Sequence, residues 1–196
     1  MGIKKTPNTI GLAFSGMMVA LVMVSNYISI PTAFSRLHVA NAMCMLAGML
    51  FGGLRGAVIA GLGSALYDLT YPAYAAEAWI TFLTKGIMAL VCGMMIVNSK
   101  GLRLRQTYRL PLGSVAGALT YIVLYMLKSY LQMRFVTAVP ADTIPTALLG
   151  KLSSSLINGL FAVIVAPILY VPIMQALRKS GLARHLPIPE SRGDCY

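Results

Sequence analysis

Long apolar segments separated by short polar connections dominate the sequence. The apolar segments cover residues 10–30, 38–53, 56–70, 77–97, about 112–133 and about 147–177. A helix needs about 20 apolar residues to cross a hydrocarbon core about 30 Å thick, and most of these segments come close to that length. The pattern therefore predicts an all-α integral membrane protein that forms a six-transmembrane-helix bundle.

The basic residues indicate the orientation of the predicted helices. One set of connections and the chain ends together hold Lys4, Lys5, Arg55, Lys100, Arg103, Arg105, Arg109, Arg178, Lys179, Arg184 and Arg192. The opposite connections hold only Arg36 and Arg134. Cytoplasmic loops carry the excess of Lys and Arg, so we expect both termini in the cytoplasm. Residues 1–177 then form a single membrane domain, and residues 178–196 form a basic, then Pro-rich, cytoplasmic tail.

Composition argues against a soluble protein and against a nucleic-acid partner. Of 196 residues, 58% are hydrophobic and only 11% are charged, which is too few to cover a soluble globule. The net charge of +11 comes from short basic segments between apolar runs, where such residues act as topology signals. The three cysteines have no paired spacing, so we expect no disulfide framework, no metal site and no cofactor.

Three charged side chains interrupt the stretch at residues 65–86, ALYDLTYPAYAAEAWITFLTKG. Asp68, Glu77 and Lys85 lie within or beside apolar spans, where ionisable residues are candidate functional groups by default. Pro72 and the tyrosines around it predict a short aromatic loop at the membrane interface. At a rise of 1.5 Å per residue, Lys85 lies about 12 Å below Glu77, near the membrane midplane.

Helical periodicity gathers polar residues from several spans on single faces. These sets are His38 and Asn41; Ser64, Asp68 and Tyr71; Glu77, Thr81 and Lys85; Tyr121, Tyr125 and Lys128; and Lys151, Ser154, Ser155 and Asn158. Most of these residues fall in the outer half of their spans, which predicts a ligand pocket that opens outward. We add Tyr67 and Tyr74 to the candidate substrate-binding residues because they belong to the same aromatic stretch.

Structural roles are the alternatives for several of these residues. Lys128 and Lys151 lie near helix ends and could extend to the headgroups. Asp68 and Lys85 could form a purely structural ion pair. The serines of the last span could simply let helices approach. Packing residues of this kind should occur in both halves of the membrane, whereas the inner halves of the spans are nearly free of polar residues.

Small residues form a stripe on the first predicted helix. Gly11, Ser15, Gly16 and Ala20 follow one another at helical spacing, which allows another helix to approach closely in lipid. The approaching helix could belong to this bundle or to a partner protein.

Three parts of the sequence together resemble a known family, the substrate-binding S components of energy-coupling-factor (ECF) vitamin transporters. They are the small-residue stripe, RLHVANAMCMLAGMLFGGLRGAVIAGLGSALYDL at residues 36–69, and TFLTKG at residues 81–86. The resemblance is strongest to the riboflavin and hydroxymethylpyrimidine group. The last two spans match only in hydropathy and length. Ala40-Asn41 and the Gly16/Ala20 pair depart from the usual residues of the family.

The resemblance implies a protein of the bacterial plasma membrane that binds a vitamin or related micronutrient from outside. It implies docking through the first helix on a transmembrane coupling (T) component that works with two cytoplasmic ATPases. The chain has no Gly-x-x-x-x-Gly-Lys-Ser/Thr phosphate loop, so ATP would be hydrolysed by those partners and not by this chain.

Two other function classes compete with this interpretation. A membrane enzyme could use His38, Asp68 and Glu77, but the sequence has no HExxH pair or nucleophile elbow. An ion-coupled carrier could use Asp68 and Lys85, but no inverted repeat is visible. Three pocket-side cations against two acids favour a ligand with a carboxylate, a phosphate or polarised carbonyls, whose aromatic ring would stack on tyrosines.

Overall fold

The computed structural model describes residues 9–31, 36–97, 106–137, 139–140 and 142–185. Its long helices are α1 (Thr9–Tyr27), α2 (Ala40–Phe51), α3 (Gly53–Leu69), α5 (Ala78–Val97), α6 (Gln106–Leu131) and α7 (Ile144–Lys179). Lys4, Lys5, Lys100, Arg103, Arg105, Arg192 and the end of the predicted tail, residues 186–196, lie outside the described residues.

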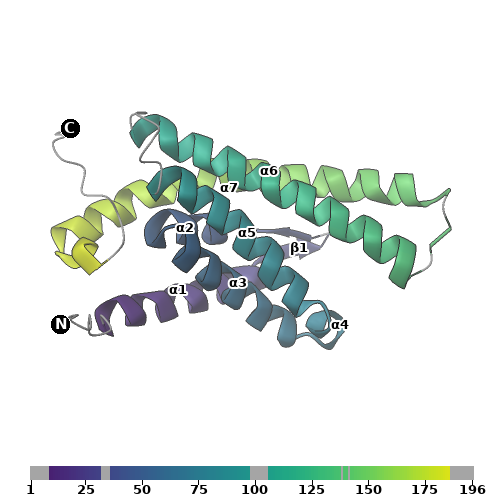
Figure 1. Ribbon diagram of the computed structural model, residues 1–196, viewed down its shortest axis with the longest axis horizontal. Helices are drawn as coiled ribbons and strands as arrows, with labels where there is room; N and C mark the ends of the chain where they lie inside the picture. Colours follow the sequence, from purple (N-terminus) through teal and green to yellow (C-terminus); the bar gives the residue numbers. More distant parts are fainter. Residues whose placement is uncertain (1–8, 32–35, 98–105, 138, 141, 186–196) are drawn as a thin grey trace, which may run out of the picture.

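The long helices pack into an elongated bundle. Helices α6 and α7 run side by side along its length, and α3 and α5 pack against each other beneath them (Figure 1). The start of α1 and the end of α7 lie at the same end of the bundle, and the one-turn helix α4 (Pro72–Ala75) lies at the other (Figure 1). A π-helical turn, η1 (Gln132–Val136), follows α6, and a 3-10 turn, η2 (Leu182–His185), follows α7.

Apolar side chains cover the outside of the bundle as well as its core. On α6, Leu119, Val123 and Leu127 are each more than half exposed and lie four residues apart on one face. Such a face suits lipid, because a helix in a bilayer needs no polar surface. Within the described residues, α1, α5, α6 and α7 contain segments long and apolar enough to cross a membrane.

Glycines bring α2, α3 and α5 close together in the half of the bundle away from α4. A Cβ atom added at Gly56 of α3 would lie 2.6 Å from the Cα atom of Gly48 on α2. A Cβ atom at Gly93 of α5 would lie 2.6 Å from the Gly48 carbonyl oxygen. Real Cβ atoms do not approach so closely, so only glycine permits this packing.

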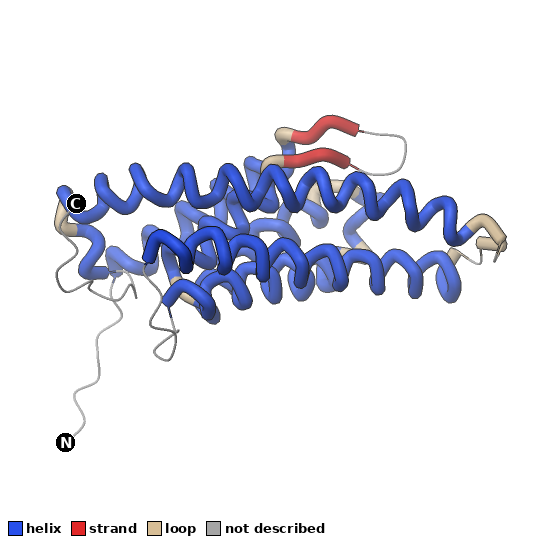
Figure 2. The backbone as a smooth tube through the Cα atoms, turned by 90° about the horizontal axis from the view of Figure 1, so that it is seen from above, coloured by secondary structure: helices blue, strands red, loops and turns tan. Residues whose placement is uncertain are grey.

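The first helix is shorter than predicted. It ends at Tyr27, and residues Ser29–Pro31 form strand β1, which pairs antiparallel with β2 (Arg36–His38). This two-stranded ribbon lies along one side of the bundle (Figure 2). The prediction that His38 lies on the second helix was therefore wrong, because α2 begins at Ala40. Its pairing partner Ser29 on β1 holds His38 in an extended backbone instead.

Other helix boundaries also differ from those predicted. A single residue, Gly52 with a φ of 78°, separates α2 from α3, so Leu54 and Arg55 belong to α3 and not to a connection. Glycine is suited to this left-handed backbone because it has no Cβ atom. The predicted aromatic loop contains α4, whose first residue is Pro72, a favourable position for proline.

Candidate functional site

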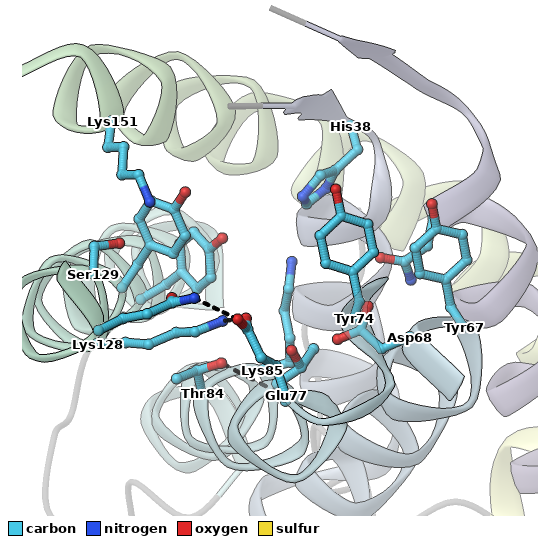
Figure 3. A pocket seen from close by; sticks show the side chains of 15 residues that line it. His38, Tyr67, Asp68, Tyr74, Glu77, Thr84, Lys85, Lys128, Ser129 and Lys151 are labelled. Atoms are coloured by element: carbon cyan, nitrogen blue, oxygen red, sulfur yellow. Dashed lines mark hydrogen bonds and ion pairs between the residues drawn. The ribbon is translucent and has the colours of Figure 1, made fainter. Parts of the chain in front are cut away.

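The predicted polar faces meet in a partly enclosed cavity of about 310 Å³ at the α4 end of the bundle. Its lining consists of Asn26, His38, Tyr67, Asp68, Tyr74, Glu77, Thr81, Thr84, Lys85, Tyr121, Tyr125, Lys128, Ser129, Gln132 and Lys151. These residues come from α1, β2, α3, α4, α5, α6, η1 and α7 and from the residue just before α5 (Figure 3). A cavity of this size and polarity in an apolar bundle is a candidate ligand site.

Lys85 lies deepest among the charged groups of the cavity. Its side chain is 4% exposed, and Nζ donates a hydrogen bond to Oδ1 of Asn41 on α2. The ammonium group also lies 4.7 Å from the ring centroid of Tyr121, within the range of a cation–π contact. Both partners are neutral, so this buried charge is held by an amide dipole and an aromatic face.

Asp68 does not form the structural ion pair with Lys85 that the sequence left open. Among the described residues, the structure has no carboxylate within ion-pair distance of Lys85. Asp68 lies instead beside Thr81 of α5, within electrostatic reach of Lys128 and Glu77 as well. Lys85 remains within electrostatic reach of Asp68, but direct contact belongs to Asn41 and Tyr121.

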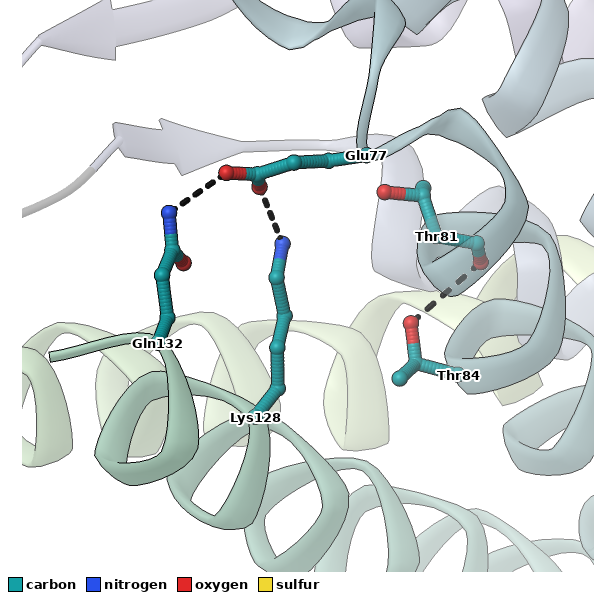
Figure 4. Close-up of polar contacts among 5 residues, drawn as sticks. All are labelled: Glu77, Thr81, Thr84, Lys128 and Gln132. Atoms are coloured by element: carbon teal, nitrogen blue, oxygen red, sulfur yellow. Dashed lines mark hydrogen bonds and ion pairs between the residues drawn. The ribbon is translucent and has the colours of Figure 1, made fainter. Parts of the chain in front are cut away.

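An ion pair joins α5 and α6 beside the cavity. Lys128 Nζ lies 2.6 Å from Glu77 Oε2, and Gln132 Nε2 donates a hydrogen bond of 2.5 Å to Glu77 Oε1 (Figure 4). The Lys128 and Glu77 side chains are only 18% and 26% exposed. Glu77 immediately precedes α5 and Lys128 lies in the last turn of α6, so this contact connects the start of α5 with the end of α6.

Tyrosines form the aromatic walls of the cavity. Tyr121 and Tyr125 stack on α6 with ring centroids 5.7 Å apart and planes inclined by 19°. On the α3 and α4 side, Tyr67 contacts Tyr71, which in turn contacts Tyr74, at centroid distances of 5.2 and 6.4 Å. Tyr67 and Tyr74 line the cavity, whereas Tyr71 is exposed and does not.

Asn158 ties the strand ribbon to α7. Its Oδ1 accepts a hydrogen bond of 3.0 Å from the backbone N–H of His38. His38 itself turns its imidazole ring toward the cavity (Figure 3). Asn158 does not line the cavity. It fixes the backbone of His38, which does.

The cavity gathers most of the predicted site residues, but not all of them. The predicted residues in its lining are His38, Tyr67, Asp68, Tyr74, Glu77, Thr81, Lys85, Tyr121, Tyr125, Lys128 and Lys151. Asn41, Tyr71, Ser154 and Asn158 do not line it. Ser154 donates a hydrogen bond to the carbonyl of Gly150 in its own helix.

Sequence reasoning missed Asn26, Thr84, Ser129 and Gln132, which also line the cavity. Helical spacing contained a signal for two of them. Gln132 follows Lys128 by four residues, and Thr84 follows Thr81 by three, so each continues a polar face already identified. Within the described residues, no three His, Cys, Asp or Glu side chains lie close enough to hold a metal ion.

The small-residue stripe of α1 points partly away from the bundle. Gly16 and Ala20 are exposed, and a Cβ atom added at Gly16 would meet nothing within 4 Å. Gly11 and Ser15 are half-buried, and the Ser15 hydroxyl donates a hydrogen bond to the Gly11 carbonyl. Packing within this bundle therefore does not account for a small residue at position 16.

Comparison with known proteins gives one match along most of the chain. Residues 7–179 match the family model described as ECF-type riboflavin transporter, S component, which confirms the resemblance noted from the sequence. An "Uncharacterized protein in gap 3'region" of Pyrococcus woesei is 34% identical over 105 residues. That match covers 53% of this chain and 65% of the relative, so it spans less than two thirds of the relative's length.

A solved structure resembles the bundle more remotely. It is the crystal structure of FolT bound with folic acid, with 16% sequence identity and a TM-score of 0.43. The match covers 79% of this chain and 98% of the other.

Proposed function

Because this chain belongs to the family of ECF-type riboflavin transporter S components, we propose that it captures a vitamin or related micronutrient outside the cell. It releases this ligand inward when a transmembrane coupling component and two cytoplasmic ATPases act on it. The proposed location is the bacterial plasma membrane, with six spans and both termini in the cytoplasm. The chain is a binding subunit and not an enzyme.

The observation that carries this proposal is the polar cavity at one end of an apolar bundle. Charged and tyrosine side chains from several helices line it, and the glycine-packed half of α2, α3 and α5 lies beyond it. Polar groups at this depth are costly unless they serve a ligand or pair with each other. A one-sided cavity also suits a subunit that binds a ligand and depends on partners to release it.

Purified protein in detergent offers a direct test of this function. Native mass spectrometry should detect a small molecule of vitamin size bound to the chain, and the ATPases should co-purify from the native membrane. Uptake into proteoliposomes that contain only this chain and an ion gradient would instead support an ion-coupled carrier.

We expect Gly16→Leu to block transport while leaving ligand binding unchanged. Gly16 has open space beside it, so leucine fits the isolated bundle but keeps a partner helix at a distance. The measurement is co-purification with the coupling component, together with ligand affinity. Met17→Leu is the control, since Met17 is also exposed on α1 but carries a large side chain already. Loss of ligand binding with an intact complex would count against the docking role.

The proposed orientation predicts a pattern of cysteine labelling. In a background with Cys195→Ser, a cysteine at exposed Ala73 should react with an impermeant thiol reagent added to intact cells. A cysteine at exposed Ser180, at the opposite end of the bundle, should react only after the membrane is opened. The native Cys44 and Cys92 are buried and serve as an internal blank. The reverse labelling pattern would invert the orientation.

A further inference from the structure

The ionised side chains that line the cavity do not cancel one another. They are three lysines, Lys85, Lys128 and Lys151, against two carboxylates, Asp68 and Glu77. Glu77 is occupied by Lys128 at 2.6 Å. This leaves two lysines, Lys85 and Lys151, against one carboxylate, Asp68, so the described lining carries one positive charge in excess.

Lys85 and Lys151 both have no ion-pair partner among the described residues, but Lys85 is held by Asn41 and Tyr121, which leaves the excess charge to Lys151. The Asp68 carboxylate lies within electrostatic reach of Lys85 and Lys128. Among the described residues, the structure has no carboxylate within ion-pair distance of Lys151. A partly buried ammonium group in a membrane protein needs an anion or water, because the surrounding apolar groups cannot solvate it.

The direction of Lys151 argues against a headgroup contact. Lys151 lies in the second turn of α7, and its side chain descends toward the cavity lining (Figure 3). Its neighbours Leu149 and Leu156 are at least half exposed and occupy the outer surface of the same helix. A lysine that reaches the headgroups follows the outer surface, whereas this side chain faces the interior of the site.

Aromatic rings lie on both sides of the same space. The stacked pair Tyr121 and Tyr125 belongs to α6, and Tyr67 and Tyr74 line the side formed by α3 and α4. Walls of this kind favour a planar aromatic ligand, since offset stacking adds to the burial of its ring. The cavity volume of about 310 Å³ is at the lower end of the range for small-molecule sites.

We infer that the ligand is a planar aromatic molecule with a carboxylate or phosphate group, and that Lys151 selects it by contacting this anionic group. The inference rests on the proposed binding function and narrows its substrate class. It distinguishes an anionic ligand from a neutral one that offers only carbonyl oxygens. Lys151 is thus a specificity-determining residue, while the tyrosines contribute affinity for the ring.

Matched probe pairs that share a ring system and differ in charge test this inference. Suitable pairs are nicotinamide and nicotinate, pterin and pterin-6-carboxylate, and riboflavin and its phosphate monoester. Binding to the detergent-solubilised full chain is measured by tyrosine and tryptophan fluorescence, and any molecule that co-purifies is identified by native mass spectrometry. In at least one pair, we expect the anionic member to bind at least about 10-fold tighter than the neutral member. An anionic aromatic molecule that co-purifies with the chain would support the inference equally.

Lys151→Met should remove this preference. The affinity for the anionic probe, or for the anionic molecule that co-purifies, should fall about 10- to 100-fold, and the affinity for the neutral probe should not change. Lys179→Met is the matched control, because Lys179 ends the same helix about 42 Å away and is exposed. A simple loss of folding would weaken both members of a pair equally.

Two results overturn the inference and leave the proposed function intact. One is a neutral probe, or a neutral co-purified molecule, that binds as tightly as its anionic counterpart. The other is an anion preference that survives Lys151→Met. If no probe binds and no small molecule co-purifies, the binding function and the inference both fail.

Discussion

Replacing Lys85 with methionine should lower ligand affinity by about 1.5 to 3 kcal/mol, the range for a lost hydrogen bond to a charged group. The stability of the unliganded protein should change little. Among the described residues, Lys85 has no ion-pair partner and contacts the neutral Asn41 side chain and the Tyr121 ring, so its removal breaks no ion pair. Ligand titration and thermal unfolding in detergent measure the two effects separately.

Asp68 provides the control for this experiment. If Asp68 were the true counter-charge, Lys85→Met alone would destabilise the unliganded protein by about 3 to 5 kcal/mol. The double substitution Lys85→Met/Asp68→Asn would then restore part of that loss. Wild-type affinity in Lys85→Met would remove Lys85 from the binding site.

The second large effect is expected from Gly56→Leu, which should destabilise the bundle by about 3 kcal/mol, the upper end of the usual range for overpacking a core. Even the first side-chain carbon would lie 2.6 Å from the Cα atom of Gly48 and 2.8 Å from the Ala47 carbonyl oxygen. These are backbone atoms, so relief requires α2 and α3 to separate and not merely a side chain to turn. The loss is measured as the shift of the unfolding midpoint in detergent.

Gly16→Leu is the matched control for Gly56→Leu. It makes the same change within a helix, but a Cβ atom at Gly16 meets nothing within 4 Å. Its unfolding midpoint should stay close to that of the wild type. Leucine has a higher helix propensity than glycine, so this contribution is favourable in both variants and does not distinguish them. Equal unfolding midpoints of the two variants would therefore mean that close approach of α2 and α3 does not restrict the residue at position 56.

Hydropathy predicted the existence of the long helices because lipid imposes a simple rule on them. An apolar run near 20 residues long must satisfy its backbone internally, and a helix does so. The same periodicity placed Asp68, Glu77 and Lys85 around one cavity, since helical faces follow directly from spacing. The boundaries were less certain, because the short segment from Ser29 to His38 is apolar enough to extend either neighbouring helix.

Pairings between helices were beyond the reach of single-helix patterns. Glu77 pairs with Lys128, and Lys85 bonds Asn41, across 51 and 44 residues of sequence. Opposite charge made Asp68 a possible partner of Lys85, but Asn41 of α2 and Tyr121 of α6 contact it instead. The close glycine contacts of α2 with α3 and α5 also lie outside what hydropathy registers.

The helices of this bundle differ widely in length. Helix α2 has 12 residues and α7 has 36, which correspond to about 18 and 54 Å along their axes. The molecule therefore has no single hydrophobic thickness, and a bilayer that fits α7 is too thick for α2. Because mismatch costs only fractions of a kcal/mol per Å, a change in tilt redistributes it cheaply. We therefore expect bilayer thickness to influence how this protein is oriented in the membrane.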